Sequence, residues 1–191
     1  MNIFFLHPNP RKAARWHLDK HVVKMILESV QMLYTAHWVL CYPELLTCKS
    51  PIAVSRLQKT LAAPPVFQTA PTGGYRPVHV HHPCTVWVRT TRGNYRWLSQ
   101  LALELCREFR FRYDHEHSCY IHAKWLYENP PSALLGMNQT IAAIAMDSKY
   151  RINKNPVCCY RNFYKKSKVE ERGLGKYTNR HMPHWFSGEN K

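Results

Sequence analysis

A narrow polar stripe on the first long helical segment is the feature of this sequence best suited to chemistry. Residues 11–39 contain no Gly or Pro, and on a helix at about 100° per residue their apolar side chains sweep about 220° of the circumference. The polar side chains on the remaining arc follow one another at intervals of four and three residues, and they are His17, His21, Lys24, Glu28, Gln31 and Thr35. This pattern predicts a helix that forms the floor of a cleft.

Glu28 is the only carboxylate on this stripe, with Lys24 one helical turn before it and His21 two turns before it. In a half-buried cleft a carboxylate can act as a general acid or stabilise a developing positive charge. The alternative is a structural ion pair between Glu28 and Lys24, which contributes only about 0.2–0.5 kcal/mol on an exposed helix. The stripe alone leaves both interpretations open.

The histidines raise the question of a metal site. His17 and His21 are four residues apart, and His79, His81 and His82 lie together in one loop. Imidazole nitrogens are common ligands of transition metals, but the loop has no acidic neighbour in sequence and the chain has no Cys-x-x-Cys pair. We therefore expect no metal and no cofactor, and His82 could instead contact a phosphate or a base.

The chain is strongly basic, with 27 Lys and Arg against 12 Asp and Glu and a formal net charge of +15. Within 149–180, ten Lys and Arg face only Glu170 and Glu171, and aromatic residues alternate with the basic ones. Basic side chains can follow a phosphate backbone, and aromatic rings can stack on bases. We expect duplex DNA as the partner, contacted by Lys24, His82, Tyr160, Arg161, Tyr164, Lys165, Lys166 and Lys168. The alternative places the aromatics in the core and leaves a basic surface that serves solubility or virion packaging.

Length and composition predict one folded helical domain. The 191 residues are 45% hydrophobic and 13% aromatic, which excludes a disordered basic tail. No run of 18 apolar residues occurs and residues 1–6 carry no basic side chain, so we expect neither a membrane span nor a signal peptide. Seven cysteines without paired spacing favour reduced thiols. The expected class is mainly α, with 1–191 as a single compact domain of undetermined oligomeric state.

The expected elements follow from periodicity and from the positions of Pro and Gly. An extended piece at 2–6 precedes the helix at 11–39. The Pro-rich segment 42–82 predicts a long irregular excursion around one short helix. A second long helical stretch runs from 83 to about 113, with a break near 93–94. The remaining expected elements are the short helix at 53–62, helices at 116–127, 138–148 and 156–168, and an irregular tail at 170–191.

Several of these residues occur in a known arrangement. Asp19-Lys20-His21, followed seven residues later by Glu28, resembles the first long helix of the pyrimidine-dimer DNA glycosylase (endonuclease V-type) family of phages and large viruses. The aromatic-basic segments 110–113 and 160–165 follow in the same order as in that family. The chain also resembles a group of uncharacterised phage and viral proteins that begin Met-Asn-Ile-Phe, carry Asp-Lys-His-Val-Val-Lys-Met-Ile-x-Glu and end in Pro-x-Trp-Phe, here 183–186.

The first resemblance implies DNA repair chemistry. It implies that Glu28, Met1 and His21 are catalytic residues. In the implied reaction the chain's own α-amine attacks C1′ of a damaged nucleotide, and Glu28 protonates the sugar or stabilises its positive charge. Asn2 is too large for removal of the initiator methionine, so the amine is that of Met1. As a class, α-amines titrate near pH 7.7–8, which leaves a nucleophilic fraction at neutral pH.

The resemblance also implies a virus- or phage-encoded protein that works in the host cytoplasm or nucleus, or within the virion. The arginines that hold phosphates on either side of the family's glutamate are replaced here by Leu27 and Gln31. Two other functions remain open from the sequence. One is a DNA-binding or virion-packaging protein without catalysis, and the other is a metal-dependent nuclease or base-modifying enzyme.

Overall fold

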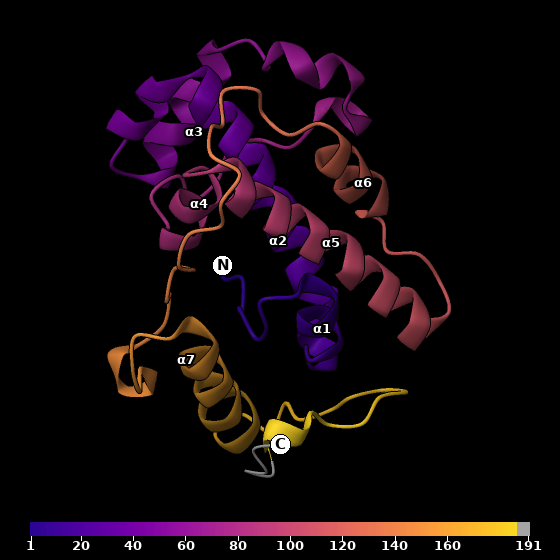
Figure 1. The fold of residues 1–191 in the computed structure, drawn as a ribbon. Helices are drawn as coiled ribbons and strands as arrows, with labels where there is room; N and C mark the ends of the chain where they lie inside the picture. Colours follow the sequence, from indigo (N-terminus) through magenta and orange to yellow (C-terminus); the bar gives the residue numbers. More distant parts are fainter. Residues whose placement is uncertain (187–191) are drawn as a thin grey trace.

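Two long helices, α2 (Asp19–Cys41) and α5 (Arg92–Tyr113), pack along each other at the centre of the molecule (Figure 1). The structure is a computed structural model that describes residues 1–186, so the end of the expected tail, 187–191, lies outside the described part. Within this part all regular structure is helical, which confirms the mainly α class. The buried face of α2 forms the middle of the core, with Val22, Ile26, Val30 and Leu33 inaccessible to solvent.

The helix expected at 11–39 is interrupted, which corrects the prediction. Pro10–Arg15 form α1, capped by the Asn9 side chain on the Lys12 N–H, and α2 begins at Asp19. Between them Leu18 is extended, with ψ 159°, and the Asp19 N–H donates to the carbonyl of Lys176 at 2.9 Å. A contact with a segment more than 150 residues away therefore ends the helix, without any Gly or Pro.

The Pro-rich excursion at 42–82 is confirmed. It contains the short 3₁₀ turns η1 (Pro43–Thr47), η2 (Pro65–Thr69) and η3 (Pro71–Gly73) and one α-helix, α3 (Pro51–Thr60). Ser50 caps α3 by accepting a hydrogen bond from the Ala53 N–H. The excursion is attached to α2 through its aromatic residues: Phe67 is buried, and the indole of Trp38 donates to the Tyr75 carbonyl at 2.9 Å.

The second long stretch divides into α4 (Pro83–Val88) and α5, and α6 (Tyr120–Glu128) follows close to its expected place. The break lies at 89–91, a few residues before the expected position, because the Thr91 side chain caps α5 by accepting from the Asn94 N–H. Gly93 lies inside α5, where a Cβ atom would collide with the backbone of Met137 and Asn138. Gly93 therefore permits a close chain approach instead of a break.

No helix forms at 138–148, and this prediction was wrong. The segment is part of a long connection, 129–155, between α6 and α7, whose one regular element is the short 3₁₀ turn η4 (Ser148–Tyr150) (Figure 1). Several of its backbone groups bond to side chains of other elements: the Asn94 side chain accepts a hydrogen bond from the Thr140 N–H, and the Tyr160 hydroxyl bonds to both Ala143 and Ala145. The alanine-rich composition favours a helix locally, but these tertiary hydrogen bonds hold the chain open.

The helix expected at 156–168 is formed in two parts. Pro156–Phe163 form α7, capped by Asn155, and Tyr164–Glu170 continue as the π-helical turn η5. At Gly173, with φ +62°, the chain reverses, and the Leu174 N–H bonds to the Lys168 carbonyl. Residues 174–186, which we call the C-terminal strap, then run back over α1 and α2 and end in η6 (His184–Phe186).

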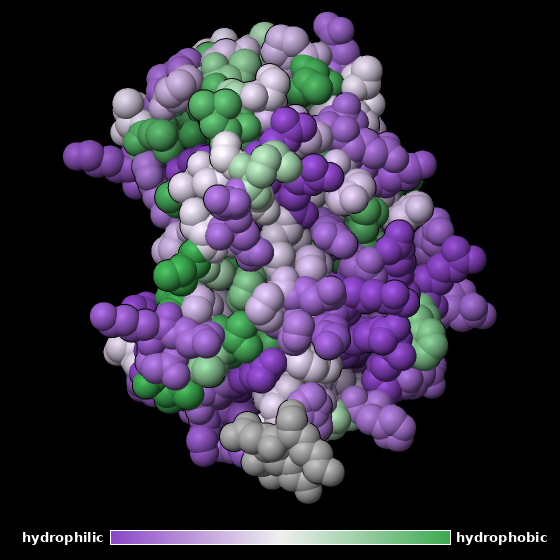
Figure 2. Space-filling model, viewed as in Figure 1, coloured by the Kyte–Doolittle hydropathy of each residue, from purple (hydrophilic) through white to green (hydrophobic). Residues whose placement is uncertain are grey.

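Two further features of the described residues bear on the environment of the chain. All seven cysteines are free thiols. None of the helices in 1–186 is long and apolar enough to cross a membrane. The face drawn in Figure 2 is mostly hydrophilic, with hydrophobic residues in smaller groups.

Candidate active site

The first four residues form a turn that the Asn2 side chain holds from both ends. Its Oδ1 accepts from the N–H groups of Ile3 (2.7 Å) and Phe4 (3.1 Å), and its Nδ2 donates to the Ala145 carbonyl at 2.8 Å. Phe4 has φ +38°, a backbone conformation that costs a non-glycine residue about 1–3 kcal/mol. Because the surroundings impose this conformation, the start of the chain is fixed in position.

Glu28 receives the start of the chain. Its Oε2 accepts a hydrogen bond from the Asn2 N–H at 3.0 Å and lies 3.7 Å from the α-amine nitrogen of Met1. Its Oε1 lies 3.2 Å from Nζ of Lys24, which is 61% exposed. The Met1 side chain is buried, with its sulfur 3.6 Å from the Thr85 hydroxyl. An amine and a carboxylate distant in sequence are thereby brought together.

The amine and Glu28 open into a hollow of about 280 Å³, which we call the Glu28 pocket. Its walls come from the N-terminal turn, one face of α2, the α7–η5 segment and the chain reversal after it: Met1, Asn2, Phe4, Lys20, His21, Lys24, Met25, Glu28, Phe163, Lys168, Arg172 and Leu174. A larger hollow, of about 530 Å³, lies between α2, η2 and the segment after α6. It holds no amine–carboxylate pair, and its imidazole, that of His37, is bonded to the Tyr95 hydroxyl.

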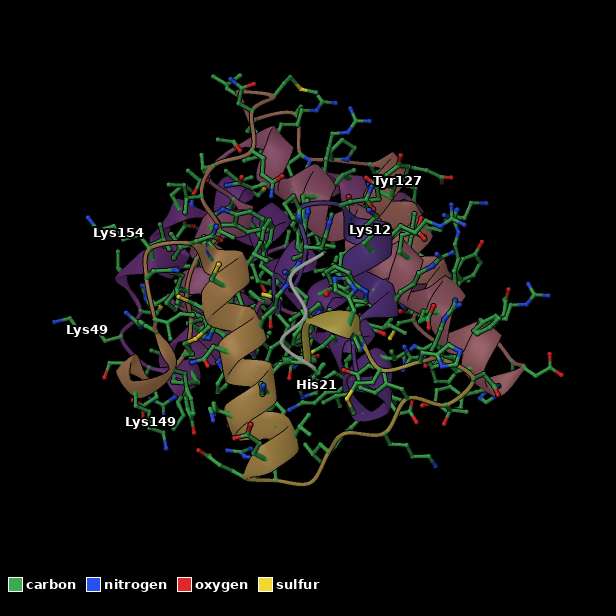
Figure 3. All side chains as sticks on the ribbon, turned by 60° about the horizontal axis from the view of Figure 1, so that its bottom comes forward. Lys12, His21, Lys49, Tyr127, Lys149 and Lys154 are labelled. Atoms are coloured by element: carbon green, nitrogen blue, oxygen red, sulfur yellow. The ribbon has the colours of Figure 1, made fainter. Side chains whose placement is uncertain are left out.

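His21 lies in the wall of the Glu28 pocket, inside the body of the molecule (Figure 3). Its ring stacks on Phe4, with centroids 4.3 Å apart, and its Nδ1 is 2.6 Å from the Tyr164 hydroxyl. Burial, and then the nearby imidazole of His17, lower the pKa of His21 to about 2. At neutral pH the ring is uncharged, so it positions the N-terminal turn and does not provide a cation.

Four cationic side chains surround the Glu28 pocket: Lys20, Lys24, Lys168 and Arg172. Lys168 differs from the others because only 7% of its surface is exposed. Its ammonium lies 4.3 Å from the centre of the Phe163 ring and 5.8 Å from that of Phe4. Burial, followed by the charges of Arg172 and Lys24, lowers the pKa of Lys168.

His82 lies beside this site, as the N-cap of α4. Its Nδ1 accepts a hydrogen bond from the Cys84 N–H at 3.2 Å. Burial lowers the pKa of His82, and the positive charge of the Met1 amine lowers it further, against the opposite effect of Glu28. The fold therefore brings His82 into the electrostatic field of the amine–carboxylate pair.

The two tyrosines expected to stack on bases are core residues. Tyr160 and Tyr164 are both inaccessible to solvent. The Tyr160 hydroxyl donates to the Ala143 carbonyl at 2.7 Å and accepts from the Ala145 N–H at 3.2 Å, while Tyr164 bonds to His21. Neither ring can meet a base in this structure, because the aromatic face of α7 and η5 turns inward.

The other expected DNA contacts have different surroundings. The Arg161 guanidinium lies over the ring of Trp16, 4.8 Å from its centroid, and donates to the Leu6 carbonyl. Lys165 donates to the Phe186 carbonyl, so both side chains attach neighbouring segments to α7 and η5. Lys166 is exposed and pairs with Glu170 one turn later. Of the basic residues expected on this segment, Lys168 is the one that reaches the Glu28 pocket.

The histidines do not assemble a metal site in residues 1–186, where no group of three or more His, Cys, Asp and Glu side chains is placed to hold an ion. His17 lies between α1 and α2, not on the stripe, and its Nδ1–H donates to the Ala13 carbonyl at 2.7 Å. Burial lowers the pKa of His17 to about 4. His81 is bonded to the Cys48 carbonyl in the excursion.

Sequence reasoning missed several residues of the site. Asn2 shapes the N-terminal turn, and Phe4 and Phe163 form apolar walls, but none of them carries a chemical signature. Lys20 and Arg172 were visible only as two of many basic residues. The most informative available signal for Lys20 was its place in the Asp19-Lys20-His21 step, one turn before Lys24.

Comparison of the chain with protein-family models, with curated proteins and with solved structures finds no match.

Proposed function

We propose that the Glu28 pocket is the active site of a DNA glycosylase/AP lyase that uses the α-amine of Met1 as its nucleophile. The observation that carries this proposal is the 3.7 Å separation between that amine and Glu28 Oε2 in a hollow walled by cations. The stripe predicted an acid or charge-stabilising role for Glu28, and the resemblance implied the amine as the nucleophile. The proposal requires that the working protein begin at Met1 with a free amine.

The chemistry would proceed through an imine. The unprotonated amine adds to C1′ of the deoxyribose: at an abasic site the N–C1′ bond forms, the carbonyl oxygen takes up a proton, and loss of water leaves a protonated imine. Where a damaged base is still attached, the amine displaces it: the N–C1′ bond forms, the bond from C1′ to the base breaks, and the base leaves with the electron pair and takes up a proton. The C1′–O4′ bond then breaks, O4′ takes up a proton, and the opened sugar is left as the protonated imine. Removal of a C2′ proton then breaks the C3′–O bond, and the 3′-phosphate departs with its electrons.

Glu28 is suited to the proton transfers in this sequence. As a carboxylate 3.7 Å from the amine, it can accept a proton from the ammonium and return one to the departing oxygen. Its negative charge also stabilises the cationic imine. The Asn2 N–H holds Oε2 at 3.0 Å, so the carboxylate keeps its orientation during the reaction.

Borohydride reduction tests the proposal, because it converts an imine between protein and DNA into a stable covalent bond. The substrates are duplex oligonucleotides that contain either one abasic site or one pyrimidine dimer. Glu28→Gln should lower trapping and cleavage about 100-fold or more while duplex affinity is retained. The matched control is Glu44→Gln, which changes an exposed glutamate outside the pocket and should react like the unmodified protein.

Mass spectrometry of the trapped product locates the bond, and the same spectrum reports whether the chain begins at Met1. Trapping on the N-terminal peptide supports the proposal. Trapping that persists after selective acetylation of the α-amine would exclude Met1 as the nucleophile. Salt-sensitive binding of duplex DNA without any trapping, and with no effect of Glu28→Gln, would instead favour a non-catalytic DNA-binding protein.

A further inference from the structure

The wall of the Glu28 pocket includes a lysine, Lys168, whose ammonium makes no ion pair within residues 1–186. Only 7% of the surface of Lys168 is exposed, the residue lines the pocket, and within residues 1–186 its ammonium has no hydrogen bond or ion pair, although the charge of Glu171 acts on it. Its neighbours are the rings of Phe163 and Phe4, which attract a cation but satisfy none of its N–H donors. An anion bound in the pocket would supply the acceptors that these N–H donors lack.

The formal charges around the pocket also favour an anionic ligand. Among the lining groups, Lys20, Lys24, Lys168, Arg172 and the Met1 amine supply five formal positive charges against the negative charge of Glu28, and Glu171 adds a second negative charge that acts on Lys168 from outside the wall. Glu28 is already shared between the amine and Lys24. The pocket therefore has room for further negative charge next to the amine–carboxylate pair, on the side of Lys168 and Arg172.

The volume of the pocket and the polar groups in its wall limit which chemical groups can be attached to such an anion. A volume of about 280 Å³ is just below the range of about 300–1,000 Å³ typical of ligand pockets, which suits one sugar-phosphate unit better than two adjacent bases. The Asn2 amide is the only uncharged amide side chain in the wall, and both of its ends are occupied. The pocket thus has no free amide group with which to read the edge of a base.

We propose that Lys168 anchors a phosphate ester in the Glu28 pocket, so that the preferred ligand is an abasic sugar-phosphate rather than a nucleotide that keeps its base. This inference rests on the proposed function for its chemistry but not for its phosphate site. Lys168 binds the phosphate, Arg172 and Lys24 flank it, and the C1′ aldehyde of the sugar lies toward the Met1 amine.

Two small probes separate the phosphate site from the imine chemistry. The full chain is incubated with 2-deoxyribose 5-phosphate or with 2-deoxyribose and reduced with borohydride, and binding of inorganic phosphate is measured by calorimetry. The phosphorylated sugar should be trapped at a concentration at least tenfold lower than the free sugar. Lys168→Met should bring this ratio close to one and weaken phosphate binding at least tenfold, and Lys168→Arg should restore most of both.

Lys154→Met is the matched control, because Lys154 is exposed and extends from the edge of the molecule (Figure 3). It should leave the ratio and the phosphate affinity unchanged. Equal trapping of the two sugars by the unmodified protein overturns the phosphate site without need of any variant, whether or not Lys168→Met folds. Phosphate binding that depends on Lys168, together with no trapping of either sugar, keeps the anion site and overturns the proposed function.

Discussion

Replacing Asp19 by asparagine should destabilise the protein by about 2–3 kcal/mol. Asp19 begins α2 and joins three parts of the chain: its Oδ1 accepts from Arg112 Nη1 and from the Thr178 N–H, both at 2.9 Å, and its Oδ2 accepts from the Thr178 hydroxyl at 2.6 Å. Removal of one member of a buried ion pair costs about 3–5 kcal/mol. The loss is smaller here because asparagine keeps one acceptor and Arg112 keeps its 2.8 Å contact with Glu108.

The pH dependence of this effect has a defined sign. Burial raises the pKa of Asp19, but the hydrogen bonds from Thr178 and Arg112 outweigh it, so the folded-state pKa is lowered. A lowered pKa means that the stabilisation is present above the unfolded value, near pH 3.9, and is lost as the pH falls through the folded value. The difference between the unmodified protein and Asp19→Asn should therefore be full at pH 7 and shrink below about pH 4.

Denaturant titration followed by circular dichroism measures the difference, and thermal unfolding should show a Tm lower by about 4–12 °C for a chain of this size. The matched control is Glu116→Gln, which breaks the 3.3 Å ion pair with Arg110 in which both side chains are well exposed. Such pairs contribute about 0–1 kcal/mol. If Asp19→Asn costs no more than Glu116→Gln, the ion pair with Arg112 and the bonds to Thr178 do not hold the strap as argued.

Two further substitutions test the corrected parts of the fold. Tyr160→Phe should lower the free energy of unfolding by about 1–3 kcal/mol, because it leaves the Ala143 carbonyl and the Ala145 N–H without their partner. An unchanged urea midpoint together with weaker DNA binding would show instead that Tyr160 contacts DNA and is not a core residue. Gly93→Ala should lower the free energy of unfolding by about 2 kcal/mol or more, although alanine favours helices, because its Cβ would collide with residues 137 and 138. Equal or higher stability in the same titration would show that the loop is not packed there.

The parts of the fold that depend on local periodicity could be predicted from the sequence. His21, Lys24 and Glu28 lie along one face of α2 in the structure and all line the Glu28 pocket, because the spacing of side chains around a helix is fixed by its geometry. The capped starts of α3 and α5 are likewise local, since Ser50 and Thr91 bond within one turn.

The features that were not predicted depend on contacts between distant segments. The break before α2 is set by the bond from Asp19 to the carbonyl of Lys176, and the loop at 138–148 by Asn94 and Tyr160. The inward position of Lys168 depends on the π-helical turn η5, which shifts the register of side chains relative to an α-helix. None of these contacts leaves a mark on the local pattern of polar and apolar residues.

The spacing of Asp19, His21 and Glu28 along α2 can be explained by the segments that each of these residues contacts. On one helix, the three residues attach segments that form or support the pocket: Asp19 holds the C-terminal strap through Thr178, His21 holds Phe4 and the η5 residue Tyr164, and Glu28 holds the backbone of the chain start. Because all three residues lie on α2, their spacing along the helix sets where these segments are attached. A pocket assembled in this way needs all three residues in register, even though only Glu28 lies next to the amine. The motif would therefore be required for the geometry of the site as much as for its chemistry.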